Sequence, residues 1–119
     1  MGFTCTYSQN ELDSLEQTFS TATSDEQRLE LLDQLASTAY HQDFQLALGY
    51  ARRGESLAKQ VGSKTWLPTF VELKGQMHAN LGNLDSAERF FQQALTGYQA
   101  TGDPRGQASA YFKFAWLHN

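Results

Sequence analysis

Residues 75–95 read GQMHANLGNLDSAERFFQQAL, and this stretch decides the fold. Apolar residues recur with helical spacing on both sides of a break at Gly82 and Asn83. A glycine that interrupts such a pattern is typical of a tight turn, and small residues let two helices approach closely. Gly82 is the glycine at the break. The small residues are Gly75, Ala87 and Ala94, and the aromatic residue Phe91 lies between the two alanines. The stretch therefore predicts two helices that form a hairpin.

The same pattern occurs 40 residues earlier in the chain. Small residues match small residues, aromatic residues match aromatic residues, and helix-ending glycines match each other. The matched pairs are Ala47 with Ala87, Tyr50 with Phe90, Gly54 with Ala94, Gly62 with Gly102, and His78 with His118. Although identity is low, these are the positions that packing dictates, so the sequence predicts a helical repeat with a period of 40 residues.

Start and stop signals divide the rest of the chain. Thr23 and Glu26 fit a capping box, Gly62 and Gly102 are typical helix ends, and Asp103 before a proline is typical of a helix start. The predicted elements are a flexible tail over 1–7, a helix over 8–22, a hairpin over 24–62, a second hairpin over 64–102, and the first helix of a third hairpin over 103–119. No stretch alternates with the period of a strand, so we expect an all-α fold, an α–α superhelix of about six helices.

The stretch from Gly75 to Leu95 resembles the tetratricopeptide repeat family, and the resemblance extends over about residues 25–119. Gly75 matches the small site of a first helix, and Ala87, Phe91 and Ala94 match the sites of a second helix. The period departs from the family's usual ~34 residues, and Lys74 and His78 stand where the family prefers Leu and Tyr. Repeats of this length are similar to those of bacterial signalling and regulatory proteins. A different solenoid of helical hairpins is the alternative fold.

The resemblance implies a binding groove, because stacked first helices line the concave face in this family. Carried onto this sequence, the groove residues are Tyr40, Thr69, Glu72, Gln76, Asn80, Phe112 and Trp116. Glu72 stands where chaperone-binding members carry a base that holds a peptide carboxylate, so we do not expect that activity. A mixed polar and aromatic groove suits a protein or peptide segment with apolar anchors.

The last predicted helix carries five large apolar residues, which are Tyr111, Phe112, Phe114, Trp116 and Leu117. A first helix without its partner exposes apolar surface. Two explanations remain open: the chain continues in a longer protein, which we favour, or this helix packs against a second copy. We therefore expect self-association, as a homo-oligomer, through these residues.

Composition excludes several classes of protein. The chain has 119 residues, 9 basic against 13 acidic side chains and a net charge of −4, which argues against nucleic-acid binding. No apolar segment is long enough to span a membrane, and one lone cysteine is compatible with the cytoplasm. Gly2 and Thr6 fit an N-myristoylation pattern with Cys5 as a second lipid site, but a mobile tail is the favoured interpretation.

No enzyme motif is present, and neither a metal nor another cofactor is expected. The histidines His41, His78 and His118 lack the further nearby ligands that zinc needs, so packing roles are favoured. The sequence therefore predicts a non-enzymatic interaction or sensor module, the N-terminal part of a larger cytoplasmic protein of signal transduction or regulation. The alternative is a freestanding adaptor or scaffold that acts mainly by self-association.

Overall fold

The computed structural model describes the backbone of residues 2–118 and the side chains of residues 9–118. Over this range it contains six α-helices and no strand. They are α1 (Gly2–Ser20), α2 (Asp25–Tyr40), α3 (Phe44–Val61), α4 (Trp66–Asn80), α5 (Leu84–Thr101) and α6 (Pro104–Leu117). The predicted all-α fold is thus confirmed. None of the described helices combines the length and the apolarity needed to cross a lipid bilayer.

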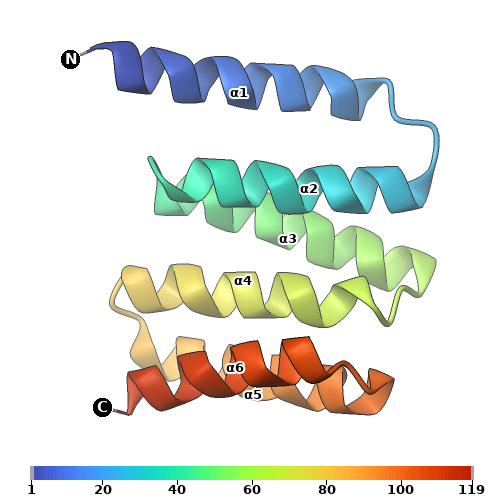
Figure 1. The fold of residues 1–119 in the computed structure, drawn as a ribbon, viewed down its shortest axis with the longest axis vertical. Helices are drawn as coiled ribbons and strands as arrows, with labels where there is room; N and C mark the ends of the chain where they lie inside the picture. Colours follow the sequence, from blue (N-terminus) through green and yellow to red (C-terminus); the bar gives the residue numbers. More distant parts are fainter. Residues whose placement is uncertain (1, 119) are drawn as a thin grey trace.

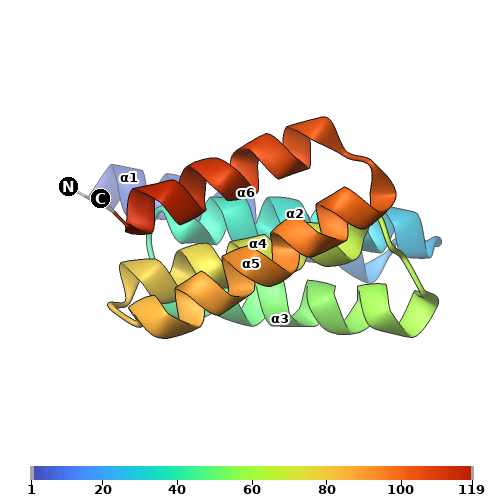
Figure 2. The same ribbon diagram turned by 90° about the horizontal axis from the view of Figure 1, so that it is seen from below.

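The helices pack as adjacent hairpins (Figure 1). Helix α2 pairs with α3 and α4 pairs with α5, while α1 lies on α2 and α6 lies on α5. Helices α2, α4 and α6 lie side by side at the front of this view, with α3 and α5 behind them. Figure 2 shows the same arrangement from below, with α5 crossing between α3 and α6. The front helices therefore form one face of the molecule.

Most predicted helix ends are confirmed by the backbone. Gly62 and Gly102 have φ values of 71° and 67°, the left-handed conformation that glycine adopts without strain at a helix end. Asp103 caps α6 by accepting a hydrogen bond from the Gly106 amide at 3.0 Å. Short connections therefore follow the helices that end at these glycines.

The N-terminal part of the chain differs from the prediction in two ways. Helix α1 begins at Gly2, whereas the first helix was expected to start at residue 8; a helix that has already formed gains one hydrogen bond for each residue added, and no proline interrupts this segment. The cap of α2 is Ser24, whose hydroxyl accepts from the Gln27 amide at 3.1 Å, and the Gln27 side chain accepts from the Thr23 amide at 3.3 Å. The predicted box of Thr23 and Glu26 was therefore misplaced by one residue.

The core is built where large side chains meet glycines on neighbouring helices. Phe70 of α4 is fully buried, and its ring occupies the space where a Cβ on Gly54 of α3 would lie. A Cβ on Gly75 of α4 would lie 2.8 Å from the ring of Phe91 of α5, which is also buried. Because real Cβ atoms do not approach a ring so closely, glycine is required at both positions.

This close packing predicts opposite effects for two glycines of α3. Gly54→Ala should lower the free energy of unfolding by about 1–3 kcal/mol, because the buried ring of Phe70 has no room to move. Gly49→Ala should raise it by about 0.5–1 kcal/mol, because no atom lies within 4 Å of the added Cβ and alanine favours the helix. Urea denaturation of the two variants measures both changes. Equal effects of the same sign would contradict the packing described here.

Candidate functional site

A cavity of about 210 Å³ lies on the front face, where the C-terminal parts of α2, α4 and α6 meet. It is lined by Tyr40, Gln76, Ala79, Asn80, Phe91, Phe112, Lys113 and Trp116. Five of the seven predicted groove residues are among them, namely Tyr40, Gln76, Asn80, Phe112 and Trp116. The structure thus brings most of the predicted site together at one end of the face.

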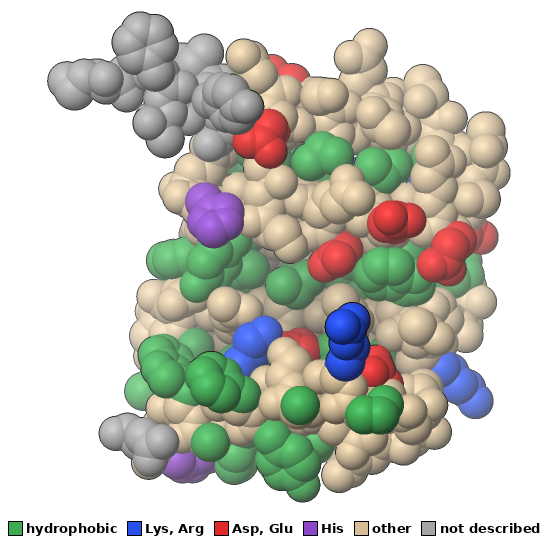
Figure 3. Space-filling model, viewed as in Figure 1, with side chains coloured by type: hydrophobic (Ala, Val, Ile, Leu, Met, Phe, Trp, Pro, Cys, Tyr) green, Lys and Arg blue, Asp and Glu red, His purple; other side chains and the backbone are tan. Residues whose placement is uncertain are grey.

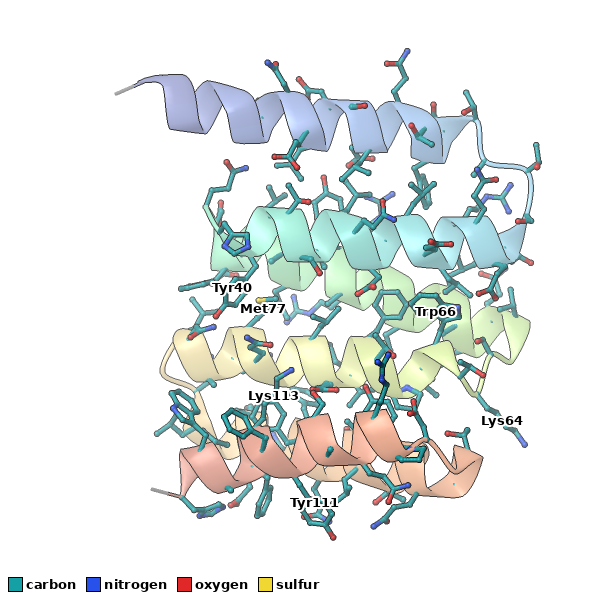
Figure 4. The ribbon with its side chains drawn as sticks, viewed as in Figure 1. Tyr40, Lys64, Trp66, Met77, Tyr111 and Lys113 are labelled. Atoms are coloured by element: carbon teal, nitrogen blue, oxygen red, sulfur yellow. The ribbon has the colours of Figure 1, made fainter. Side chains whose placement is uncertain are left out.

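Residues one repeat apart contact each other along this face. Asn80 donates a hydrogen bond to the Tyr40 hydroxyl at 2.8 Å, and these residues are 40 positions apart. At the other end of the same helices, the Trp66 indole donates to the Glu26 carboxylate at 2.7 Å, again across 40 positions. Helices α2 and α4 are therefore stacked in register, with equivalent positions side by side. Figure 4 shows Tyr40 and Trp66 at opposite ends of the gap between these helices.

The open wall of the cavity is aromatic and exposed. Phe112 is 73% exposed and Trp116 is 60% exposed, although both are large apolar side chains on one face of α6. Figure 3 shows hydrophobic side chains gathered over the C-terminal part of α6 and the adjoining end of α4. Exposed apolar surface beside a cavity is typical of a site that another molecule covers.

Glu72 does not face the groove as predicted, because it is only 5% exposed. Its carboxylate accepts hydrogen bonds from the Tyr98 hydroxyl at 2.6 Å, from the Ser109 hydroxyl at 2.5 Å and from the Lys113 ammonium at 2.5 Å. Burial, followed by this contact with Glu72, raises the pKa of Tyr98 above its usual range, so its hydroxyl remains a donor. Glu72 therefore fixes α5 and α6 onto α4 and is not available to a partner.

Thr69 also lies outside the cavity. It stands about one turn before Glu72 on α4 and is half-buried. The three cavity residues outside the seven predicted groove residues are Ala79, Phe91 and Lys113. Lys113 follows Glu72 by 41 positions and extends from α6 toward α4 (Figure 4), so a search for opposite charges about one repeat apart would have found it.

The five residues predicted for self-association lie on two faces of α6. Phe112 and Trp116 border the cavity, whereas Tyr111 is 56% exposed and points away from α4 (Figure 4). Phe114 and Leu117 are half-buried, and the Phe114 ring lies 4.7 Å from that of His118. Helix α6 thus presents two separate apolar surfaces. The groove face carries Phe112 and Trp116, and the Tyr111 face is the side of α6 that carries Tyr111.

The histidines have local partners among the described residues. His118 lies 2.8 Å from the Glu88 carboxylate, and His78 lies 3.3 Å from the Asn83 amide. Burial, with a smaller effect of nearby Arg52 and Lys74, lowers the pKa of His78. Within the part of the chain whose side chains are placed, no three His, Cys, Asp or Glu residues are grouped as metal ligands would be.

No protein-family model matches this chain, and a search of curated proteins finds no significant match. The resemblance to tetratricopeptide repeats therefore stays a prediction, and the function must be argued from the geometry of the site.

The contacts of Glu72 predict the effect of removing its cation. Lys113→Met should lower the free energy of unfolding by about 2 kcal/mol, because the carboxylate stays buried without its counter-charge. The double variant Glu72→Gln, Lys113→Met should be more stable than Lys113→Met alone, because a neutral amide still accepts from Tyr98. Urea denaturation at neutral pH measures both. An unchanged free energy of unfolding in Lys113→Met would contradict a structural role for this ion pair.

Proposed function

We propose that this chain is a protein-interaction module that binds a peptide segment in the groove between α2, α4 and α6. The observation that carries the proposal is the cavity with an exposed aromatic wall, Phe112 and Trp116, opposite a polar pair, Tyr40 and Asn80. Apolar anchors of a helical or extended segment would enter the cavity, and the amide of Gln76 would bond its backbone or a polar side chain.

The surroundings of the cavity support a protein partner. Trp and Tyr are the residue types that most often dominate the binding energy of protein interfaces. Lys113 reaches the cavity but its charge is matched by Glu72, so the site carries no net charge that would select a strongly charged ligand. In our proposal the module has no enzymatic activity, resembles the tetratricopeptide repeats, and serves a cytoplasmic protein of signalling or regulation.

Peptide selection tests the groove. A phage-displayed peptide library selected on the immobilised chain should give sequences with apolar anchors. Trp116→Ala should weaken their binding at least tenfold, since a buried aromatic anchor contributes about 2 kcal/mol. The double variant Gln76→Ala, Asn80→Ala should also weaken it without loss of helicity in circular dichroism.

The matched control is Tyr111→Ala, which removes an equally exposed aromatic residue from the other face of the same helix. At a low chain concentration this variant should bind the selected peptides as tightly as the unchanged protein. Equal losses for Trp116→Ala and Tyr111→Ala, or no loss for either, would place the site elsewhere.

A second candidate function is self-association through the Tyr111 face. One repeat earlier, Val71 and Gly75 of α4 are covered by α5: Val71 packs with Leu95, and Gly75 lies against Phe91. The equivalent positions on α6 are Tyr111 and Ala115, and both are exposed. The surface that a second helix covers in the preceding hairpin is therefore open here, and a helix of a second copy would fit it.

Light scattering tests this surface. The chain should form a dimer or larger species at high concentration, and Tyr111→Glu should shift it to the monomer because it places a charge in the covered surface. Leu84→Glu is the control, since Leu84 is 53% exposed at the start of α5 and outside this face. A chain that stays monomeric at high concentration would exclude this second function.

A further inference from the structure

A larger cavity lies away from the groove. Its volume is about 520 Å³, and it lies between the C-terminal halves of α3 and α5, over the first turns of α4. Its floor consists of Leu67, Pro68 and Val71 of α4, and Gly97 and Ala100 of α5 form its side. This volume is within the range of sites for small organic molecules, which are mostly apolar with a few polar groups.

The two repeats differ in the side chains that line this cavity. The equivalent place in the first repeat, lined by α2 and α3 with Phe19 of α1, contains Arg28 and Leu57. The shift of 40 residues matches Arg28 with Pro68 and Leu57 with Gly97. The apolar proline ring thus takes the place of a charged side chain, and a glycine takes the place of a bulky one. The first-repeat cavity has a volume of about 410 Å³, so both repeats have a hollow here and the two exchanges change the lining of the larger one.

Gly97 has a second effect on the floor. A Cβ at this position would lie 2.6 Å from Cγ of Pro68, so only glycine lets α5 lie directly on the proline ring. Pro68 is consequently buried beneath α5 and remains a fixed part of the floor. The apolar floor is thus rigid, as a site for a specific ligand requires.

The mouth of the cavity carries a positive charge in an acidic protein. Lys59 and Lys64 stand at its edge, together with Glu55. The Glu55 carboxylate is only 15% exposed and lies 2.5 Å from the Lys74 ammonium, which matches its charge, whereas the Lys59 ammonium is 3.5 Å away and 64% exposed. Among the described residues, Lys64 takes part in no ion pair, and Figure 4 shows it at the connection between α3 and α4.

We propose that this cavity binds a small carboxylate with an apolar body. The body would lie on Leu67, Pro68 and Val71, and the carboxylate would meet the ammonium groups of Lys59 and Lys64. Burial of the apolar body supplies most of the affinity, while the two lysines select an anion over a neutral molecule of the same shape. Such a site would give the module a small-molecule signal that is separate from its peptide groove.

Octanoate and 1-octanol test the proposal, because they share a chain and differ in charge. In amide NMR spectra, octanoate should shift the resonances of Gly97 and Thr101 in a saturable way, and octanol should bind at least tenfold more weakly. Lys59→Gln, Lys64→Gln should weaken octanoate about tenfold and leave octanol unchanged. Arg89→Gln, Arg105→Gln is the control, since it removes the same charge from exposed positions outside the cavity and should change neither.

Ala100→Phe tests the place of binding. Ala100 is exposed and lines the cavity, so the larger side chain can fill the cavity without disturbing the core. This variant should lose both ligands and keep its helicity. Equal binding of octanoate and octanol, shifts confined to Phe112 and Trp116, or unchanged binding to Ala100→Phe would each overturn the proposal.

Discussion

The structure depends on close contacts between glycines and aromatic rings on successive helices. Each ring fills the place of a missing side chain, so the helix axes approach more closely than two ordinary residues allow. The three contacts are Gly54 with Phe70 between α3 and α4, Gly75 with Phe91 between α4 and α5, and Gly106 with Tyr98 between α5 and α6. Because one contact follows another along the chain, the position of each helix is set by the helix before it.

The last of these contacts also orients α6 on the front face. Tyr98 lies against Gly106 and at the same time donates to Glu72, whose carboxylate accepts from Ser109 and Lys113 of α6. One buried carboxylate thus connects three helices and fixes how α6 is rotated. That rotation directs one aromatic face of α6 toward the cavity and leaves the Tyr111 face open.

Local signals in the sequence predicted the helices, and the resemblance to tetratricopeptide repeats suggested the groove residues, five of which line the cavity. Gly62 and Gly102 predict helix ends from the local sequence alone. Tyr40 and Asn80 are 40 residues apart, one repeat period, and they lie side by side in the structure. The burial of Glu72 was not predictable in the same way, because its partners lie 26, 37 and 41 positions away and follow no single spacing. The larger cavity left two sequence signals, the exchange of Arg28 for Pro68 and of Leu57 for Gly97 between equivalent positions.

The two ends of the stack have different surfaces, and this difference has energetic consequences. The exposed residues of α1 within 9–20 are all polar, as in a helix that caps a solenoid, whereas α6 exposes three aromatic side chains and buries only Gly106 and Ala110. Little apolar burial therefore holds α6, and its attachment relies on the packing of Gly106 against Tyr98 and on the contacts of Ser109 and Lys113 with Glu72. A segment with few buried contacts opens at a lower free energy than the core. In the proposed function, a partner that covers the aromatic residues of α6 would stabilise the helix that binds it and would thereby couple recognition to local folding.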